Sequence, residues 1–109
     1  MLMSTASVLQ DLEYYLPDKQ STKKIAQFFA VFADCSRLRL LSALAISPLC
    51  VSDIATVLEM NQTTVSHQLK TLRDLGFVDF DRRGKILHYK LTNPKINEIV
   101  LLGVEHLGY

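Results

Sequence analysis

The stretch from Met60 to Val78 constrains the fold more than any other part of the chain. Four apolar residues recur there at helical spacing and form one stripe, while hydrogen-bonding side chains fall on the opposite side. The stripe consists of Val65, Leu69, Leu72 and Leu75, and the polar side carries Gln62, Thr63, Ser66, His67 and Lys70. Asn61 is a suitable N-cap, and Gly76 is a suitable end. We therefore predict an amphipathic helix between Asn61 and Gly76.

The polar side of this helix carries side chains that can read base edges, followed by cations that can hold phosphate. A helix of this kind, preceded by a short helix and a tight turn, is the recognition element of a helix-turn-helix. The alternative is a plain solvated face, since amphipathic helices are common and this polar side holds few lysines or arginines. The residues that follow favour the first interpretation.

Those residues predict a hairpin with a basic tip, which we call the wing (residues 78–91). Segments 78–81 and 86–91 alternate apolar and polar residues, as half-buried strands do, and Leu87, Tyr89 and Leu91 share one face. Gly84 supplies the positive φ that a tight hairpin needs. The tip cations are solvated or contact DNA phosphate or the minor groove; they are Arg82, Arg83 and Lys85. Two helices followed by a basic hairpin give the order of a winged helix-turn-helix.

The other helices follow from capping residues and proline. We expect a first helix over about 5–16, ending before Pro17, and a second that begins near Ser21 as its N-cap. Asp34 is expected to cap a third helix, and Ser52 a short fourth helix that runs through Leu58. A last helix is expected to begin near Asn93-Pro94 and to reach about residue 107.

Length and charge indicate one small domain whose positive charge is concentrated in one region. The 109 residues predict one domain over 1–109, and 49% are hydrophobic, so an oligomer interface is expected. The net charge is only +1, yet residues 61–95 hold seven cations against three anions. Positive charge is thus concentrated on the predicted helix and wing, and DNA binding should depend strongly on salt.

Four motifs in order resemble the ArsR/SmtB family of bacterial transcriptional repressors. Residues 33–41 (ADCSRLRLL) resemble the family's AD-P-T-RLRLL opening, and 49–55 (LCVSDIA) resemble LCVCDLA. Residues 62–69 (QTTVSHQL) resemble QSxVSHHL, and 72–78 (LRDLGFV) resemble LRxAGLV. Together they cover the chain from about Ala30 to about Leu91, and more loosely both ends.

The resemblance implies an α+β fold, mostly α: a winged helix-turn-helix with a two-stranded wing and extra N- and C-terminal helices. It also implies a homodimer that pairs through helices 5–16 and 93–107 and binds an inverted-repeat operator in double-stranded DNA. Gln62, Thr63, Ser66 and His67 would then lie nearest the bases. The phosphate candidates are Lys70, Arg73, Arg82, Arg83 and Lys85.

Family members often sense metals through two ligand sets, and both are incomplete in this sequence. The cysteine pair of the CVC segment corresponds to Cys50 and Ser52, and a hydroxyl is a poor substitute for thiolate toward soft metals. The Asp-x-His and His-x-x-His positions of the last helix hold Asn93, Lys95, His106 and Tyr109. Only His106 matches, so we expect the zinc-type site to be absent.

Cys35 and Cys50 are the remaining effector candidates, and both precede or begin predicted helices. A helix N-terminus favours a reactive thiolate, so the two are expected either to bind a thiophilic metal or to form a redox-sensitive disulfide. Such a site could also recruit Asp53 or a residue of the partner's N-terminal segment. The alternative is that each cysteine is a small buried apolar residue.

Three function classes follow. The first is a dimeric repressor released by a metal or thiol-directed signal, the second a constitutive repressor without an effector site, and the third a winged-helix module that binds protein. An enzyme is not expected, since no plausible catalytic set or glycine-rich phosphate loop is present. No signal peptide or membrane-spanning run is apparent, so we expect a cytoplasmic protein without a membrane partner, with reduced thiols.

Overall fold

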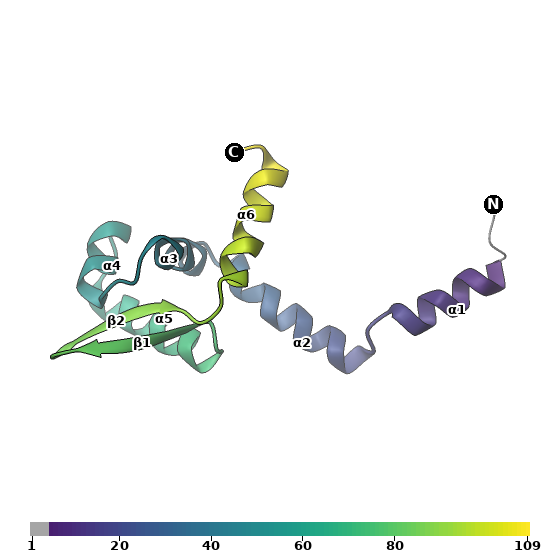
Figure 1. Ribbon diagram of the computed structural model, residues 1–109, viewed down its shortest axis with the longest axis horizontal. Coiled ribbons are helices and arrows are strands. Elements are labelled where there is room, and N and C mark those ends of the chain that lie inside the picture. Colours follow the sequence, from purple (N-terminus) through teal and green to yellow (C-terminus); the bar gives the residue numbers. More distant parts are fainter. Residues whose placement is uncertain (1–4) are drawn as a thin grey trace. The chain divides into compact units, whose positions relative to one another are not determined.

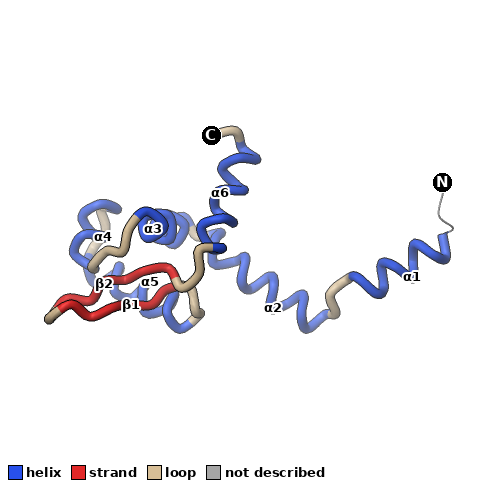
Figure 2. Tube along the Cα trace, in the orientation of Figure 1, coloured by secondary structure: helices blue, strands red, loops and turns tan. Residues whose placement is uncertain are grey.

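The structure is a computed structural model that describes residues 5–109. The chain divides into two compact units, one that ends at Val31 and one that runs from Phe32 to Tyr109 (Figures 1 and 2). The first unit holds α1 (Thr5–Tyr15) and α2 (Lys19–Ala30). A short 3-10 helix, Val31–Ala33, spans the boundary. The second unit holds α3 (Cys35–Ile46), α4 (Val51–Leu58), α5 (Gln62–Asp74), β1 (Val78–Arg83), β2 (Ile86–Leu91) and α6 (Lys95–Leu107). This element order is the predicted one.

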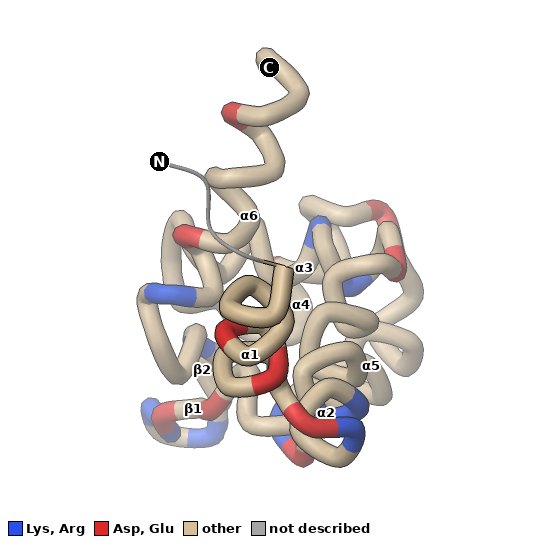
Figure 3. Tube along the Cα trace, turned by 90° about the vertical axis from the view of Figure 1, so that its right-hand side faces the viewer, with Lys and Arg blue, Asp and Glu red and all other residues tan. Residues whose placement is uncertain are grey.

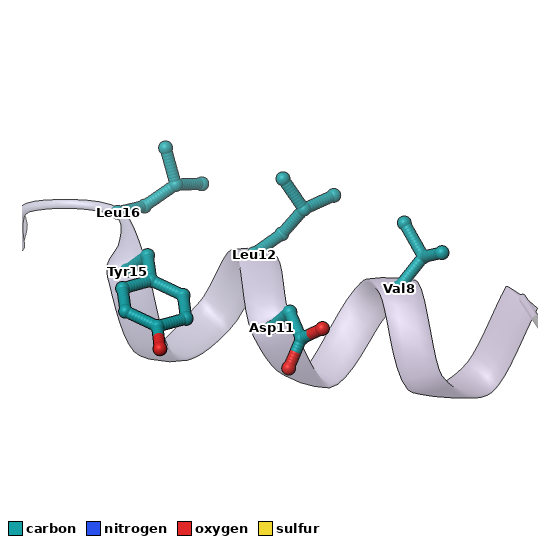
Figure 4. A pocket seen from close by; sticks show the side chains of 5 residues that line it. All are labelled: Val8, Asp11, Leu12, Tyr15 and Leu16. Atoms are coloured by element: carbon teal, nitrogen blue, oxygen red, sulfur yellow. The ribbon is translucent and has the colours of Figure 1, made fainter. Parts of the chain in front are cut away.

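Helix α1 exposes its apolar residues. Val8, Leu12 and Leu16 are four residues apart and point to the same side of the helix (Figure 4). Their exposed fractions are 39%, 48% and 63%. An apolar stripe of this kind on a helix is ordinarily buried against another element, whereas the stripe of α1 is open to solvent in the structure.

Helix α2 begins earlier than predicted. Asp18 is its N-cap, and its Oδ1 accepts a hydrogen bond of 2.7 Å from the backbone N–H of Ser21. This backbone hydrogen bond, with a second one from the Ser21 hydroxyl, lowers the pKa of the Asp18 carboxyl. The expectation that Ser21 itself caps the helix was wrong, because the helix begins at Lys19 and Asp18, a residue equally suited to capping, occupies the N-cap.

The core of the second unit is built from the facing sides of its helices. The buried residues are Leu40, Leu41 and Leu44 of α3, Ile54, Ala55 and Leu58 of α4, Val65, Leu69 and Leu72 of α5, Phe77, Val78 and Ile96. The predicted stripe of α5 is thus confirmed for three of its four residues. Leu75 is 54% exposed, because α5 ends at Asp74 and Leu75 occupies the C-cap. Gly76 follows with a positive φ of 83°, as predicted for the helix end.

The two strands form an antiparallel sheet whose register places Val78 opposite Leu91, Phe80 opposite Tyr89 and Arg83 opposite Ile86. The connection is the two-residue turn Gly84-Lys85, with φ +64° at Gly84 and no positive φ at Lys85. A glycine at the first central position is the signature of a type II′ hairpin turn. Arg82 and Arg83 therefore belong to β1 rather than to the loop, which corrects their predicted place at the tip.

Helix α4 also begins earlier than predicted, at Val51, with Cys50 rather than Ser52 at the N-cap. Its other end leads into the turn before α5. There Glu59 adopts the left-handed conformation (φ 54°, ψ 46°), and the N–H of Met60 donates to the carbonyl of Ala55 at 2.9 Å. This is the position where glycine is usually found, and Glu59 is the one non-glycine residue with a positive φ in residues 5–109.

Replacing Glu59 with glycine is expected to raise the free energy of unfolding by about 0.5–1 kcal/mol. Relief of left-handed strain outweighs the extra entropy that glycine gives the unfolded chain. Urea denaturation of Glu59→Gly beside Glu59→Ala measures this, because alanine keeps the Cβ and removes only the carboxylate. Equal gains in both variants would assign the effect to charge and contradict the strain.

Candidate nucleic-acid interface

The outer face of α5 presents the predicted polar set to solvent. Gln62, Thr63, Ser66, His67 and Lys70 are all exposed, while Val65, Leu69 and Leu72 on the inner face have relative exposures of 0%. Asn61 caps the helix as predicted, since its Oδ1 accepts from the N–H of Thr63 at 2.7 Å. The buried face fixes the rotation of the helix, so its outer face is held in one orientation. Such a surface fits into a DNA major groove.

The wing carries exposed cations along its outer half. Arg82, Arg83 and Lys85 are exposed, and within residues 5–109 none of them forms a salt bridge. Figure 3 shows lysine and arginine positions along this hairpin with aspartates between them. Lys90 by contrast pairs with Asp81 at 3.0 Å across the two strands. Three cations that have no salt-bridge partner in the described part of the chain are suited to phosphate contacts.

Arg73 differs from the other phosphate candidates. It lies in the last turn of α5, and its Nε is 3.7 Å from Oδ1 of Asp79. Its guanidinium carbon lies 4.1 Å from the centre of the Phe80 ring. Arg73 therefore interacts with two residues of β1, through an ion pair with Asp79 and a cation–π contact with Phe80. The sequence pattern did not indicate these contacts.

The two cysteines are free thiols in different settings. Cys35 is exposed at the first position of α3, where Asp34 is the N-cap as predicted. Cys50 is half-buried and lines a cleft of about 320 Å³ between the starts of α4 and α5 and the wing. The other lining residues are Val51, Ser52, Gln62, Lys85, Ile86 and Leu87. Neither cysteine is fully buried, contrary to the core alternative, and Cys50 shares its cleft with two DNA-contact candidates.

The last-helix positions show local structural roles. Oδ1 of Asn93 accepts from the backbone N–H of Lys95 at 2.9 Å, which supports the start of α6. His106 lies exposed in the last turn of α6, where a cation suits the helix dipole. Among residues 5–109 no group of three or more His, Cys, Asp or Glu side chains is placed to hold a metal ion.

The sequence reasoning missed two features of the interface. The first is the fastening of Arg73 to Asp79 and Phe80, and an aromatic residue shortly after a helix-terminal arginine is its only sequence signal. The second is a bridge between Leu49 and Tyr89, whose backbones exchange hydrogen bonds of 3.0 and 2.8 Å. Nothing in the local sequence of residues 49 and 89 indicates this long-range pairing.

A recognition helix set on a helix-turn-helix, followed by a basic hairpin, defines a winged helix-turn-helix DNA-binding regulator. Residues 34–79 match the model of the bacterial regulatory protein family arsR. The chain belongs to this family, whose members are DNA-binding transcriptional regulators and not enzymes. The predicted fold class is confirmed, and no helix in residues 5–109 is long and apolar enough to cross a membrane.

Two similar proteins carry informative names. A transcriptional repressor SmtB homolog of Synechocystis sp. is 39% identical over 85 residues, which cover 78% of this chain and 64% of the relative. The crystal structure of an antimony-specific transcriptional repressor, AntR, is 34% identical with a TM-score of 0.77. That match covers 97% of this chain and 95% of AntR. The chain thus spans just under two thirds of the SmtB homolog and nearly all of AntR.

A third structure concerns assembly. The homodimeric winged helix-turn-helix DNA-binding domain Mb0332 from Mycobacterium bovis is 27% identical, with a TM-score of 0.71. The match covers 85% of this chain and 92% of that domain. The similarity extends over most of both chains and is therefore not confined to the helix-turn-helix.

Proposed function

We propose that the protein is a cytoplasmic, homodimeric repressor that reads an inverted-repeat operator with α5 and the wing. One observation carries this proposal: five hydrogen-bonding side chains occupy the exposed face of a helix whose opposite face is fully buried. The side chains nearest the bases are Gln62, Thr63, Ser66 and His67. Lys70 and the wing cations Arg82, Arg83 and Lys85 hold phosphate.

The homodimer is supported by the exposed apolar residues of the terminal helices. Leu101, Leu102 and Leu107 of α6 are 48%, 65% and 67% exposed, and the stripe of α1 is also open to solvent. A second copy that covers these faces would remove them from water. The homodimer of Mb0332 supports the same assembly. In sedimentation equilibrium we expect twice the mass of one chain.

The test of DNA binding is fluorescence anisotropy with the duplex upstream of the protein's own gene and a scrambled duplex of equal length. We expect tighter binding to the first, with log K falling linearly as log salt rises. A protein-binding module would show no steep salt slope and no preference for either duplex. That result would contradict the proposal.

We further propose that the repressor is released by a thiophilic metal or metalloid, or by a thiol-directed reagent, at Cys50. The thiol lines the same cleft as Gln62 and Lys85, so an adduct or ion there would change the DNA-reading surface directly. The antimony-specific repressor AntR supports a soft cation as the signal. Cys35 is the candidate second thiol, and a disulfide would need the two Cα atoms within about 7 Å.

Antimonite is expected to weaken operator binding of the reduced wild-type protein, and Cys50→Ser is expected to abolish that response while binding DNA normally. Soft cations favour thiolate over hydroxyl, which is the physical reason for the loss. Parallel anisotropy titrations with arsenite, cadmium and an alkylating reagent identify the chemistry. Cys35→Ser is the matched variant, because its response separates a one-thiol from a two-thiol site.

Operator binding that no reagent changes would contradict a thiol signal. It would favour the second candidate, a constitutive repressor without an effector. The incomplete ligand sets of both metal-site patterns are the observation in favour of that candidate.

A further inference from the structure

Arg73 links the end of the recognition helix to the base of the wing, beside the hydrogen bonds that Thr92 makes with the carbonyls of Gly76 and Phe77. Arg73 reaches from the last turn of α5 to Asp79 and Phe80, the second and third residues of β1. Its Nε lies 3.7 Å from the Asp79 carboxylate, and its guanidinium stacks at 4.1 Å over the Phe80 ring. The planar guanidinium suits both contacts, since arginine pairs with carboxylates and stacks on aromatic faces.

A chain of contacts leads from Phe80 across the wing to Leu49, in the segment that precedes α4. Phe80 lies opposite Tyr89 in the sheet, and their rings are 5.6 Å apart. Tyr89 exchanges backbone hydrogen bonds of 3.0 and 2.8 Å with Leu49. The wing base is therefore held on one side by α5 and on the other by the residue before Cys50.

We propose that Arg73 is a positioning residue that sets the direction of the wing relative to α5, and that it does not contact phosphate. The inference rests on the proposed function, because it assigns how the two DNA-binding elements are kept in register. Asp79 faces Nε and Phe80 covers one face of the guanidinium, so the side chain is held at the wing base although it is 52% exposed and keeps its Nη groups free. The salt dependence of binding therefore separates a positioning role from a phosphate contact. Lys70, one turn earlier on α5, is exposed and has no salt bridge within residues 5–109.

Because the wing is long, a small rotation at its base displaces the cations at its outer end. Arg83 is three residues beyond Phe80, a distance of about 10 Å at the rise of an extended strand. A rotation of the hairpin by about 10° at Phe80 therefore moves the outer cations by about 2 Å. Phosphate hydrogen bonds lie within about 2.7–2.9 Å and do not survive such a shift without rearrangement.

The experiment measures operator affinity against salt for Arg73→Ala and, as the matched cation on the same helix, Lys70→Ala. Arg73→Ala is expected to lower affinity about fivefold and to leave the slope of log K against log salt unchanged. Lys70→Ala is expected to lower that slope by about 0.9 for each protomer, the value for one lost phosphate contact. A slope that falls equally in Arg73→Ala overturns the inference.

A double-mutant cycle with Lys85→Ala tests whether Arg73 acts through the wing. Once Lys85 is removed, the effect of Arg73→Ala is expected to become smaller but not to vanish, because Arg82 and Arg83 remain on the wing, whereas Lys70→Ala should remain additive. Additivity of Arg73→Ala with Lys85→Ala also overturns the inference. Circular dichroism melting of each variant confirms that loss of affinity is not loss of fold.

Phe80→Leu gives a second, independent variant that keeps every charge. It removes the stacking surface of Arg73 and is expected to lower affinity without changing the salt slope. Unchanged affinity in Phe80→Leu would contradict the positioning role. A wild-type protein that fails to bind duplex DNA at all would overturn the proposed function as well, so the two failures are distinguishable.

Discussion

Leu72→Ala is expected to lower the free energy of unfolding by about 2–5 kcal/mol, the largest effect of any single change considered for this chain. Leu72 has a relative exposure of 0% and lies on the inner face of α5 with Val65 and Leu69. Truncation removes apolar surface from the core and leaves a cavity that closely packed neighbours fill only in part. Because small domains have only about 5–15 kcal/mol of stability, such a loss approaches the whole of it.

Urea denaturation followed by circular dichroism measures the change, with Leu75→Ala as the control. Leu75 is the same residue type three positions later but is 54% exposed, so its truncation should cost less than about 1 kcal/mol. Comparable losses in the two variants would contradict the placement of the α5 core face. Operator binding by Leu72→Ala is expected to fall with the folded fraction and to recover at lower temperature.

Gln62→Ala is expected to weaken operator binding by about 1–3 kcal/mol and to relax the choice of base at one position in each half-site. Gln62 is the first residue of α5 and is exposed, while the cap hydrogen bond is made by Asn61. The substitution therefore removes the amide that we propose to read a base, without removing the support of the helix start. A glutamine amide pairs in two places with adenine, which is the reason for the size of the effect.

The measurement is an anisotropy scan of the wild type and Gln62→Ala over operators with single base changes. Arg83→Ala is the matched comparison, because a phosphate contact should weaken every sequence alike and lower the salt slope. If Gln62→Ala loses the same affinity for operator and scrambled DNA, the base-reading role is contradicted.

Local chemistry in the sequence predicted most of the second unit, and the exceptions are informative. The caps Asp34 and Asn61 were predicted from their residue types, and the structure confirms them. Each accepts a hydrogen bond from a backbone N–H, that of Arg37 for Asp34 and that of Thr63 for Asn61. The predictions that Ser21 and Ser52 are N-caps were wrong, because each residue lies inside the first turn of a helix that begins earlier. For α2, propensity alone does not choose between Asp18 and Ser21. For α4 the N-cap is Cys50, whose side chain makes no cap hydrogen bond, so propensity favoured the wrong residue.

The candidate interface was predictable as a face, but its internal contacts were not. Helical periodicity separates Gln62, Ser66 and Lys70 from the buried stripe without any knowledge of the fold. The fastening of Arg73 and the bridge between Leu49 and Tyr89 join residues that only tertiary packing brings together. These tertiary contacts decide which surface cations interact with other residues of the protein. Local sequence patterns do not reveal them.

The two-residue turn of the hairpin has a consequence for how such proteins can vary. Because both strands must stay paired up to Gly84-Lys85, the arm lengthens only by whole cross-strand pairs, each adding about 3.4 Å. One added pair reverses which side of the arm each distal residue faces, and two pairs restore it. The length of the hairpin and the side to which its distal residues point therefore change only in discrete steps. A related protein with a longer hairpin and the same orientation of these residues must carry four additional residues.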